Sequence, residues 1–375
     1  MTSEFASIPL SSFEWPAFLQ VKRDPPPTTL VESDDFWVDY DTRTFFYDAF
    51  QDARTGEVRL FAPRMFNTER LLSEWSPCLN GVSVTRQRLI RHQRFDEISL
   101  ANRSCGPISQ LSFSVKGHPF EVPIAASEPE TFQGANVLCT VSKDNEVDWI
   151  RDWMAFHHHH HKANALLLFD NGSSKYEPVA LEEELRRVSG YKVVKVISAK
   201  FPYGPHVGAS SGIGRARFLQ AALLNLARAR FLCNARAVLN VDIDELVSSR
   251  QRISIFDSAV TSRLGLVMFY GEWRYRRTES GSPAHGDHVW KHASDRPCPS
   301  KYCYRPSGVL GRMTLDIHGL QHLSRKILPH NHDFFFAHCR SVTNSWKESR
   351  HTPAQNLSLD QRLQDDFKLA SLSTF

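Results

Sequence analysis

Four short apolar runs, separated by segments of helical spacing, constrain the fold of this chain more than any other feature. The runs occupy residues 137–141, 165–169, 191–197 and 237–241. The segments between them have the apolar spacing of helices and cover residues 148–157, 179–189 and 215–231. Strands that alternate with helices in this way form a parallel α/β sheet. The ligand site of such a sheet lies beyond the carboxyl ends of its strands, so the residues that follow each run are the candidates for a functional site.

The length of the chain predicts more than one domain. It has 375 residues, and a single hydrophobic core stops growing at roughly 250–300 residues. Residues 1–133 contain short aromatic and β-branched runs, such as 36–40 and 58–61, between turn residues, which predicts a small β-rich N-terminal region of unknown role. We expect an α/β domain over residues 134–350 and a C-terminal tail over residues 351–375.

Charge and hydropathy exclude several classes of partner. The chain carries 45 Lys and Arg against 41 Asp and Glu, a formal net charge of +4 with the signs intermixed, so nucleic acid is not an expected partner. No apolar stretch approaches the about 20 residues that cross a bilayer, and the first residues lack the pattern of a signal peptide. We therefore expect a cytoplasmic protein without an integral membrane segment, for which peripheral membrane association stays open. The seven scattered cysteines, without a Cys-x-x-Cys pair, predict reduced thiols.

The fourth apolar run leads directly into Asp242 and Asp244. If the strand continues through them, its alternation points both side chains to one side, at the edge where ligands bind. Two adjacent carboxylates repel each other unless a cation joins them. Mg²⁺ or Mn²⁺, which prefer hard oxygen ligands, would bridge them to a diphosphate. Taken alone, so short a motif is better explained by a solvated acidic turn.

Two further strand ends change that balance. The first apolar run is followed by polar groups that include Asn145 and Glu146 and open a helix. The second is followed by residues 170–174, Asp-Asn-Gly-Ser-Ser, which combine an acceptor, a turn former and hydroxyls suited to binding a base or a ribose. Three successive strand ends thus carry ligand-binding groups, and chance becomes the weaker explanation.

These groups together resemble a known family, the glycosyltransferases of families 2 and 92, which have the GT-A fold. The residues that carry the resemblance are Asn145 and Glu146, a Trp-rich helix that ends in Phe156-His157, and residues 169–173, 239–246 and 337–347. The last of these is similar to the His-Tyr/Phe-Arg segment that closes such domains. The resemblance spans about residues 134–350. It implies a Rossmann-like nucleotide-diphospho-sugar transferase domain, preceded by the β-rich region.

The resemblance also implies an activity and its residues. It implies metal-dependent transfer of a sugar from a nucleotide-sugar donor, UDP- or GDP-linked, to a hydroxyl of a glycan, glycolipid or other acceptor. The cofactor would be Mn²⁺ or Mg²⁺, with Asp242 near the donor ribose or the metal, Asp244 as a metal ligand, and Glu245 beside them in the catalytic block. A late histidine would complete the metal site, and both His318 and His338 fit. The residues implied for the nucleotide pocket are Asn145, Glu146, Asp170, Asn171 and Asp242.

The general base is open among three carboxylates, Glu272, Asp287 and Asp316. Inverting enzymes of this fold deprotonate the acceptor hydroxyl with an Asp or Glu beyond the metal motif. Glu272 follows an apolar run and is narrowly preferred as a catalytic residue. A surface ion pair with Arg274 or Arg276 explains Glu272 equally well.

Lys301 and Arg305 are the basic residues of a Lys-Tyr-Cys-Tyr-Arg segment further along the chain. Either could contact the donor phosphates. Both are equally well explained as solvated charges of a loop.

A run of histidines and a glycine-rich loop are both conspicuous, but neither is strong evidence for a functional site. Five consecutive histidines end at His161, but on a helix only His157 and His161 share a face, and a metal role for them is disfavoured. Residues 208–214 resemble the phosphate loop of short-chain dehydrogenases, and Tyr191 with Lys195 resembles their catalytic pair. The order is wrong, because in that family the loop leaves the first strand and the pair follows it on a helix. An NADP-dependent oxidoreductase therefore stays a weak alternative, behind a catalytically silent GT-A-like protein that binds a glycan or nucleotide.

Overall fold

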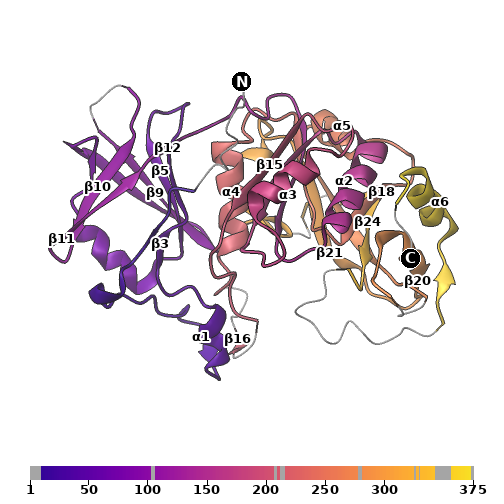
Figure 1. Ribbon diagram of the computed structural model, residues 1–375, viewed down its shortest axis with the longest axis horizontal. Coiled ribbons are helices and arrows are strands. Elements are labelled where there is room, and N and C mark those ends of the chain that lie inside the picture. The colour runs from indigo at the N-terminus through magenta and orange to yellow at the C-terminus, as the bar shows by residue number, and fades with distance from the viewer. Residues whose placement is uncertain are drawn as a thin grey trace. The chain divides into compact units, whose positions relative to one another are not determined.

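Two compact units make up the chain in the computed structural model, which describes residues 10–102, 106–206, 209–211, 216–277, 281–324, 327–328, 330–342 and 356–372. The α/β unit comprises residues 130–197 and the described residues from 234 onward. The β-rich unit comprises the described residues up to 129 together with 198–233. Figure 1 shows the elements of both units in order of colour along the chain. No helix in the described ranges is long and apolar enough to cross a membrane.

The α/β unit is built on one mixed eight-stranded sheet. The order across it is β15 (Val193–Ser198), β14 (Ala165–Asp170), β13 (Asn136–Ser142), β17 (Ala237–Asn240), β21 (Cys298–Tyr304), β19 (Leu266–Arg274), β24 (His330–Cys339) and β18 (Glu245–Ser249). Strand β13 runs parallel to both β14 and β17, whereas β21 runs antiparallel to β17. The four predicted strands are therefore confirmed, and the fold is α/β. The strand direction reverses between β17, which leads to Asp242, and its neighbour β21.

Helices cover this sheet with an apolar core between them. Helix α2 (Val147–His161) packs beside α3 (Pro178–Leu185) and against β18 (Figure 1). It buries the face that carries Ile150, Trp153 and Phe156. Helix α3 ends four residues before the predicted end, and the turn that follows reaches Gly190 at φ +88°. Only glycine fits there, because a Cβ would lie 2.1 Å from a ring carbon of His158.

The segment predicted as a C-terminal tail includes residues that fold onto the α/β unit. Strand β25 (Ser358–Leu359) pairs with β20 (Trp290–Lys291). Helix α6 (Gln361–Leu369) buries Leu363 and Phe367 in the core of the sheet unit. Asp360, which caps this helix, also accepts a hydrogen bond of 2.7 Å from Arg274 at the end of β19.

The β-rich unit contains two main sheets that share one aromatic core. The first is a five-stranded sheet in the order β12 (Ala125–Ala126), β4 (Asp48–Gln51), β5 (Val58–Pro63), β9 (Phe95–Ala101) and β8 (Arg86–Arg91). The second has the order β11 (His118–Pro123), β10 (Gln110–Val115), β6 (Cys78–Leu79) and β7 (Val82–Ser83). Leu60 of β5 and Phe113 of β10 belong to the same buried cluster, together with Trp15, Phe45 and Trp75.

One helix of the β-rich unit comes from a distant part of the sequence. Helix α4 (Leu219–Arg230) contacts β5 and β9, although its place in the sequence predicts that it belongs to the α/β domain. At its end the Arg230 guanidinium lies 2.8 Å from an oxygen of Asp48, and both side chains are buried. A charged pair in such a place ties this helix to β4. Most of the glycine-rich loop at 208–214 that precedes α4 lies outside the described residues.

The aromatic run at 36–40 is not a strand, so that part of the prediction is wrong. Residues Asp35–Asp39 form the short helix α1. A helix brings residues four apart onto one face, and here it stacks Phe36 on Tyr40 with ring centres 4.9 Å apart. Both rings belong to a small buried cluster with Phe218. The run at 58–61 lies in β5, as predicted.

Candidate metal and donor site

Asp242 and Asp244 lie in the turn between β17 and β18, not on a continued strand. Strand β17 ends at Asn240, and β18 begins at Glu245. The Asp242 amide donates to the Glu245 carboxylate at 2.9 Å, and the Glu245 amide donates to the Asp242 carbonyl at 3.0 Å. Strand alternation therefore does not apply to the two aspartates. Their side chains have different partners.

Asp244 meets His338. The Nε2 atom of His338 lies 3.1 Å from the Asp244 carboxylate, and Asp244 is only 6% exposed. The pairing of β18 with β24 places Glu245 opposite His338, and the Cys339 amide donates to the Asp244 carbonyl at 2.8 Å. Ligand atoms of Asp244, Glu245 and His338 all lie within 4.8 Å of one another. Of the two candidate histidines, it is His338 that the fold brings to the aspartate.

Trp273 fixes the ring of His338 from the neighbouring strand. The two residues are opposite each other in the β19–β24 pairing. Their rings stack with centres 4.3 Å apart and planes 25° apart. Sequence reasoning missed Trp273, because only the register of two strands 65 positions apart in the numbering makes it a neighbour of His338.

The turn that carries the aspartates is held by two further side chains. Trp153 of α2 donates its indole N–H to the Glu245 carbonyl at 3.1 Å. His285, which is fully buried, has its Nε2 atom 2.8 Å from the Ile243 carbonyl. Because that carbonyl can only accept, the hydrogen bond requires the Nε2-protonated ring. The backbone of the turn is therefore rigidly positioned between β17 and β18.

Asp242 is paired with a buried lysine. The Nζ atom of Lys301, on β21, lies 2.7 Å from the Asp242 carboxylate and 3.1 Å from that of Glu245. Lys301 is 0% exposed, so it is neither a solvated loop charge nor a surface contact for phosphates. Burial opposes its charge, but the two carboxylates outweigh burial and raise the pKa of Lys301. The signal was present in the sequence, since a lysine on a buried strand needs a charged partner.

The cluster carries excess negative charge. Burial raises the pKa of Glu245 to about 7, with Lys301 opposing the shift and Asp242 adding to it. When all three carboxylates are ionised, the group of Asp242, Asp244, Glu245 and Lys301 has two negative charges beyond the one that the lysine balances, and protonation of Glu245 reduces this excess to one. A divalent cation would neutralise that excess.

The loops after β13 and β14 are joined by hydrogen bonds among buried polar groups. Asp170 accepts hydrogen bonds from the amides of Gly172 and Ser173 at 3.2 and 3.1 Å and from the Ser173 hydroxyl at 2.5 Å, so it organises its own loop. The Asn171 amide donates to the Ser142 carbonyl at 2.8 Å. The Asn145 side chain donates to the Ser142 hydroxyl at 2.8 Å. Asn145, Asp170 and Asn171 are thus brought together, as expected from the ends of two adjacent parallel strands.

Glu146 lies at the exposed rim of these loops. It forms an ion pair with Lys175, whose amine lies 6.0 Å from the centre of the Trp149 ring. Its side chain is 52% exposed, unlike those of Asn145 and Asp170.

Glu272, the preferred candidate base, does not point toward the Asp244–His338 contact. Glu272 forms ion pairs with Arg274 at 2.7 Å and Arg250 at 2.9 Å, so the predicted alternative of an Arg274 pair is present. Along β19, Glu272 points to the opposite face from Trp273 and therefore from His338.

The other candidates have local partners. The Asp287 carboxylate accepts from the Ala284 amide at 3.1 Å, and the Asp316 carboxylate accepts from the Ile317 amide at 2.9 Å. The Nδ1 atom of His318 lies 3.2 Å from the Ser300 carbonyl. None of these residues belongs to the metal-binding group found among the described residues.

His157 and His161 are core residues of α2. His157 accepts from the Val247 amide at 3.2 Å and contacts the Trp153 carbonyl at 2.8 Å. His161 accepts from the Ile255 amide at 3.2 Å and contacts the Val247 carbonyl at 2.7 Å. All four ring nitrogens are therefore engaged by backbone groups, and each ring is held as one neutral tautomer.

Comparison with known proteins adds no relatives. No family model matches the chain, and no curated protein matches it.

Proposed function

We propose that the chain is a metal-dependent glycosyltransferase that moves a sugar from a nucleotide-diphosphate donor to a hydroxyl of a glycan or other acceptor. The observation that carries the proposal is the contact between Asp244 and His338, 94 positions apart in the sequence, at the end of β17. In the parallel part of an α/β sheet, this is the edge where ligands bind. The polar loops after β13 and β14 end at the same edge.

The donor set suits a divalent cation. Asp244 and Glu245 offer carboxylate oxygens and His338 offers an imidazole, a combination that Mn²⁺ accepts well and Mg²⁺ less readily. The buried Nδ1 atom of His338 has no hydrogen-bond partner within the described ranges. When bound, the metal would stabilise the charge of the departing nucleoside diphosphate.

The remaining residues would orient the donor. Asn145 and Asn171 would lie beside the base or ribose, and Asp170 holds the loop of Asn171 in shape. Asp242 keeps a 39% exposed side chain while Lys301 fixes its direction. It would accept a hydrogen bond from a donor hydroxyl. Glu245 would hold the turn through its contacts to the Asp242 amide and to Lys301.

Mn²⁺ titration and thermal unfolding with UDP or GDP test this proposal. Ligand at about 100 times its Kd stabilises the folded state by about 2.7 kcal/mol. We expect a metal-dependent stabilisation in the wild type that Asp244→Asn abolishes. Asp148→Asn, which removes a 71% exposed carboxylate of α2, should leave it unchanged. Stabilisation without hydrolysis of any nucleotide sugar would identify a silent relative. Stabilisation by NADP alone, or by no ligand, would contradict the proposal.

A further inference from the structure

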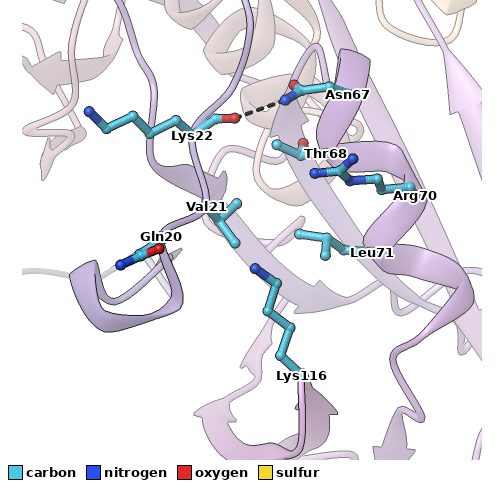
Figure 2. Close-up of a pocket in the computed structure, with 8 residues that line it drawn as sticks. All are labelled: Gln20, Val21, Lys22, Asn67, Thr68, Arg70, Leu71 and Lys116. Carbon is cyan, nitrogen blue, oxygen red and sulfur yellow. Dashed lines mark hydrogen bonds between the residues drawn. The ribbon is translucent and has the colours of Figure 1, made fainter.

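Two adjoining hollows flank one short helix of the β-rich unit, η2 (Phe66–Ser73), whose residues line both. The first has a volume of about 160 Å³ and is drawn in Figure 2. Its lining consists of Gln20, Val21, Lys22, Asn67, Thr68, Arg70, Leu71 and Lys116. The second hollow adds Phe66, Glu69, Leu72, Ser73, Gln87, Leu89 and Arg91. Asn67 and Arg70 line both, so the two hollows adjoin along η2.

The first hollow is cationic. Lys22, Arg70 and Lys116 line it, and no lining residue is acidic. Figure 2 shows the Arg70 guanidinium and the Lys116 amine directed toward the hollow from opposite sides, whereas the Lys22 side chain extends away. In the described part of the chain, none of these three cations forms an ion pair. Their charge is therefore available to a ligand.

The walls of this hollow are fixed by hydrogen bonds. The Asn67 side chain accepts from the Asp24 amide and donates to the Lys22 carbonyl, both at 2.9 Å. The second of these bonds is the dashed line in Figure 2. The Lys116 amine donates to the Leu19 carbonyl at 2.9 Å. An ammonium has three N–H donors, so Lys116 is held in place and keeps two donors for a ligand.

The second hollow mixes charge with neutral and apolar groups. Its only acid, Glu69, is paired with Arg91. The two linings together hold four cations and one anion, a local net charge of +3. Gln87 and Ser73 offer neutral hydrogen-bonding groups, and Leu72 and Leu89 offer apolar surface.

We propose that this surface binds an acidic polysaccharide, with the anionic groups of the sugar chain on Arg70 and Lys116. Sugar hydroxyls need neutral donors and acceptors, which the Gln20 amide and the amide nitrogen of Gln87 supply. The apolar side chains of the lining would lie under the C–H faces of the sugar rings. Nucleic acid would need a longer basic stripe with several aromatic stacking platforms, whereas the two linings contain a single aromatic residue, Phe66. The proposal does not depend on the transferase activity.

Binding of fluorescent oligosaccharides to the full chain tests the proposal. The probes are an oligogalacturonide, which carries carboxylates, a heparin-derived oligosaccharide, which carries sulfates, and a neutral dextran. We expect the wild type to bind at least one acidic probe and not the dextran. The double variant Arg70→Glu with Lys116→Glu should weaken that binding at least tenfold, because it replaces two charge-assisted contacts by repulsion. The comparison of the two acidic probes identifies the anionic group.

A matched variant separates a local site from overall charge. Arg151→Glu with Arg187→Glu makes the same charge change on exposed helical residues of the α/β unit. It should change binding less than twofold. An equal loss in this control would overturn the proposal. So would preferential binding to phosphatidylserine vesicles or to single-stranded DNA, or the absence of binding to either acidic probe. Mn²⁺ affinity, measured on the same proteins, should be unchanged, which keeps this test distinct from that of the metal site.

Discussion

At the scale of single residues, Lys301 separates the roles of two aspartates that the sequence presents as a pair. Asp242 contacts Lys301, and Asp244 contacts His338. The division comes from β21, which runs antiparallel to β17 and places a buried cation beside only one of the carboxylates. A search for Asp-x-Asp finds the motif but not this asymmetry.

Replacement of the buried Lys301 should lower the free energy of unfolding. Lys301→Met would leave the carboxylates of Asp242 and Glu245 without their cation, and removal of one partner of a buried ion pair costs about 3–5 kcal/mol. Urea unfolding would measure the loss. The control is Lys175→Met, which breaks an exposed pair with Glu146 and should cost no more than about 1 kcal/mol. Equal effects of the two changes would refute a structural role for the buried pair.

The stacking of Trp273 on His338 should matter for metal affinity. Trp273→Leu keeps an apolar side chain but releases the imidazole from its fixed orientation. Residues that orient a metal ligand typically change affinity by about 10- to 100-fold. Calorimetric titration with Mn²⁺ should therefore show at least a tenfold weaker Kd. The exposed Trp37→Leu serves as the control, and an unchanged Kd in both variants would show that the stacking is incidental.

The buried histidines of α2 predict acid sensitivity. Burial lowers the pKa of His161 to about 4, below the 6.5 of an exposed histidine. Between pH 6.5 and pH 4, His161 is protonated in the unfolded chain but stays neutral in the folded chain. The free energy of unfolding therefore decreases on acidification. This residue alone should remove about 2 kcal/mol between pH 7 and pH 5. His161→Gln should show a correspondingly weaker pH dependence in urea unfolding. In the exposed His159→Gln the wild-type dependence should persist.

At the scale of elements, the sequence predicts the strands that a local apolar pattern specifies. It does not predict the elements that depend on contacts with distant residues. The strands at 137–141 and 237–241 follow from short apolar runs, and both are in the sheet. The aromatic run at 36–40 has no polar alternation and became a helix because its rings meet Phe218. The site divides in the same way. Asp244 was visible in its motif, whereas Trp273 became a neighbour only through the register of β19 with β24.

Helix α6 is part of the α/β core, although its residues were predicted to form a C-terminal tail. Phe367 is 3% exposed and packs edge-to-face on Phe156 of α2 with ring centres 5.6 Å apart. Phe367→Ala should destabilise the unit by about 3–5 kcal/mol. Leu369→Ala, which truncates a 52% exposed side chain of the same helix, should have an effect below about 1 kcal/mol. Similar small effects of both changes on the free energy of unfolding would mean that the helix is only loosely attached.

At the scale of the whole molecule, the compact units do not coincide with continuous stretches of sequence. The β-rich unit needs α4, whose residues are almost all buried, and it needs Arg230 to balance the buried Asp48. We therefore expect a fragment of residues 8–129 not to fold cooperatively by itself. Circular dichroism during heating would measure this. A sharp unfolding transition in that fragment would show that residues 198–233 are dispensable.

Because the β-rich unit is built from two separate segments of the chain, its first segment is synthesised well before its second. About a hundred residues, including those of β13, β14 and β15, separate residue 129 from the end of the second segment at residue 233. A ribosome adds roughly 5–20 residues each second, so the strands of the first segment wait roughly 5–20 seconds before α4 emerges to cover β5 and β9. During that interval the nascent chain presents apolar surface that a chaperone can recognise.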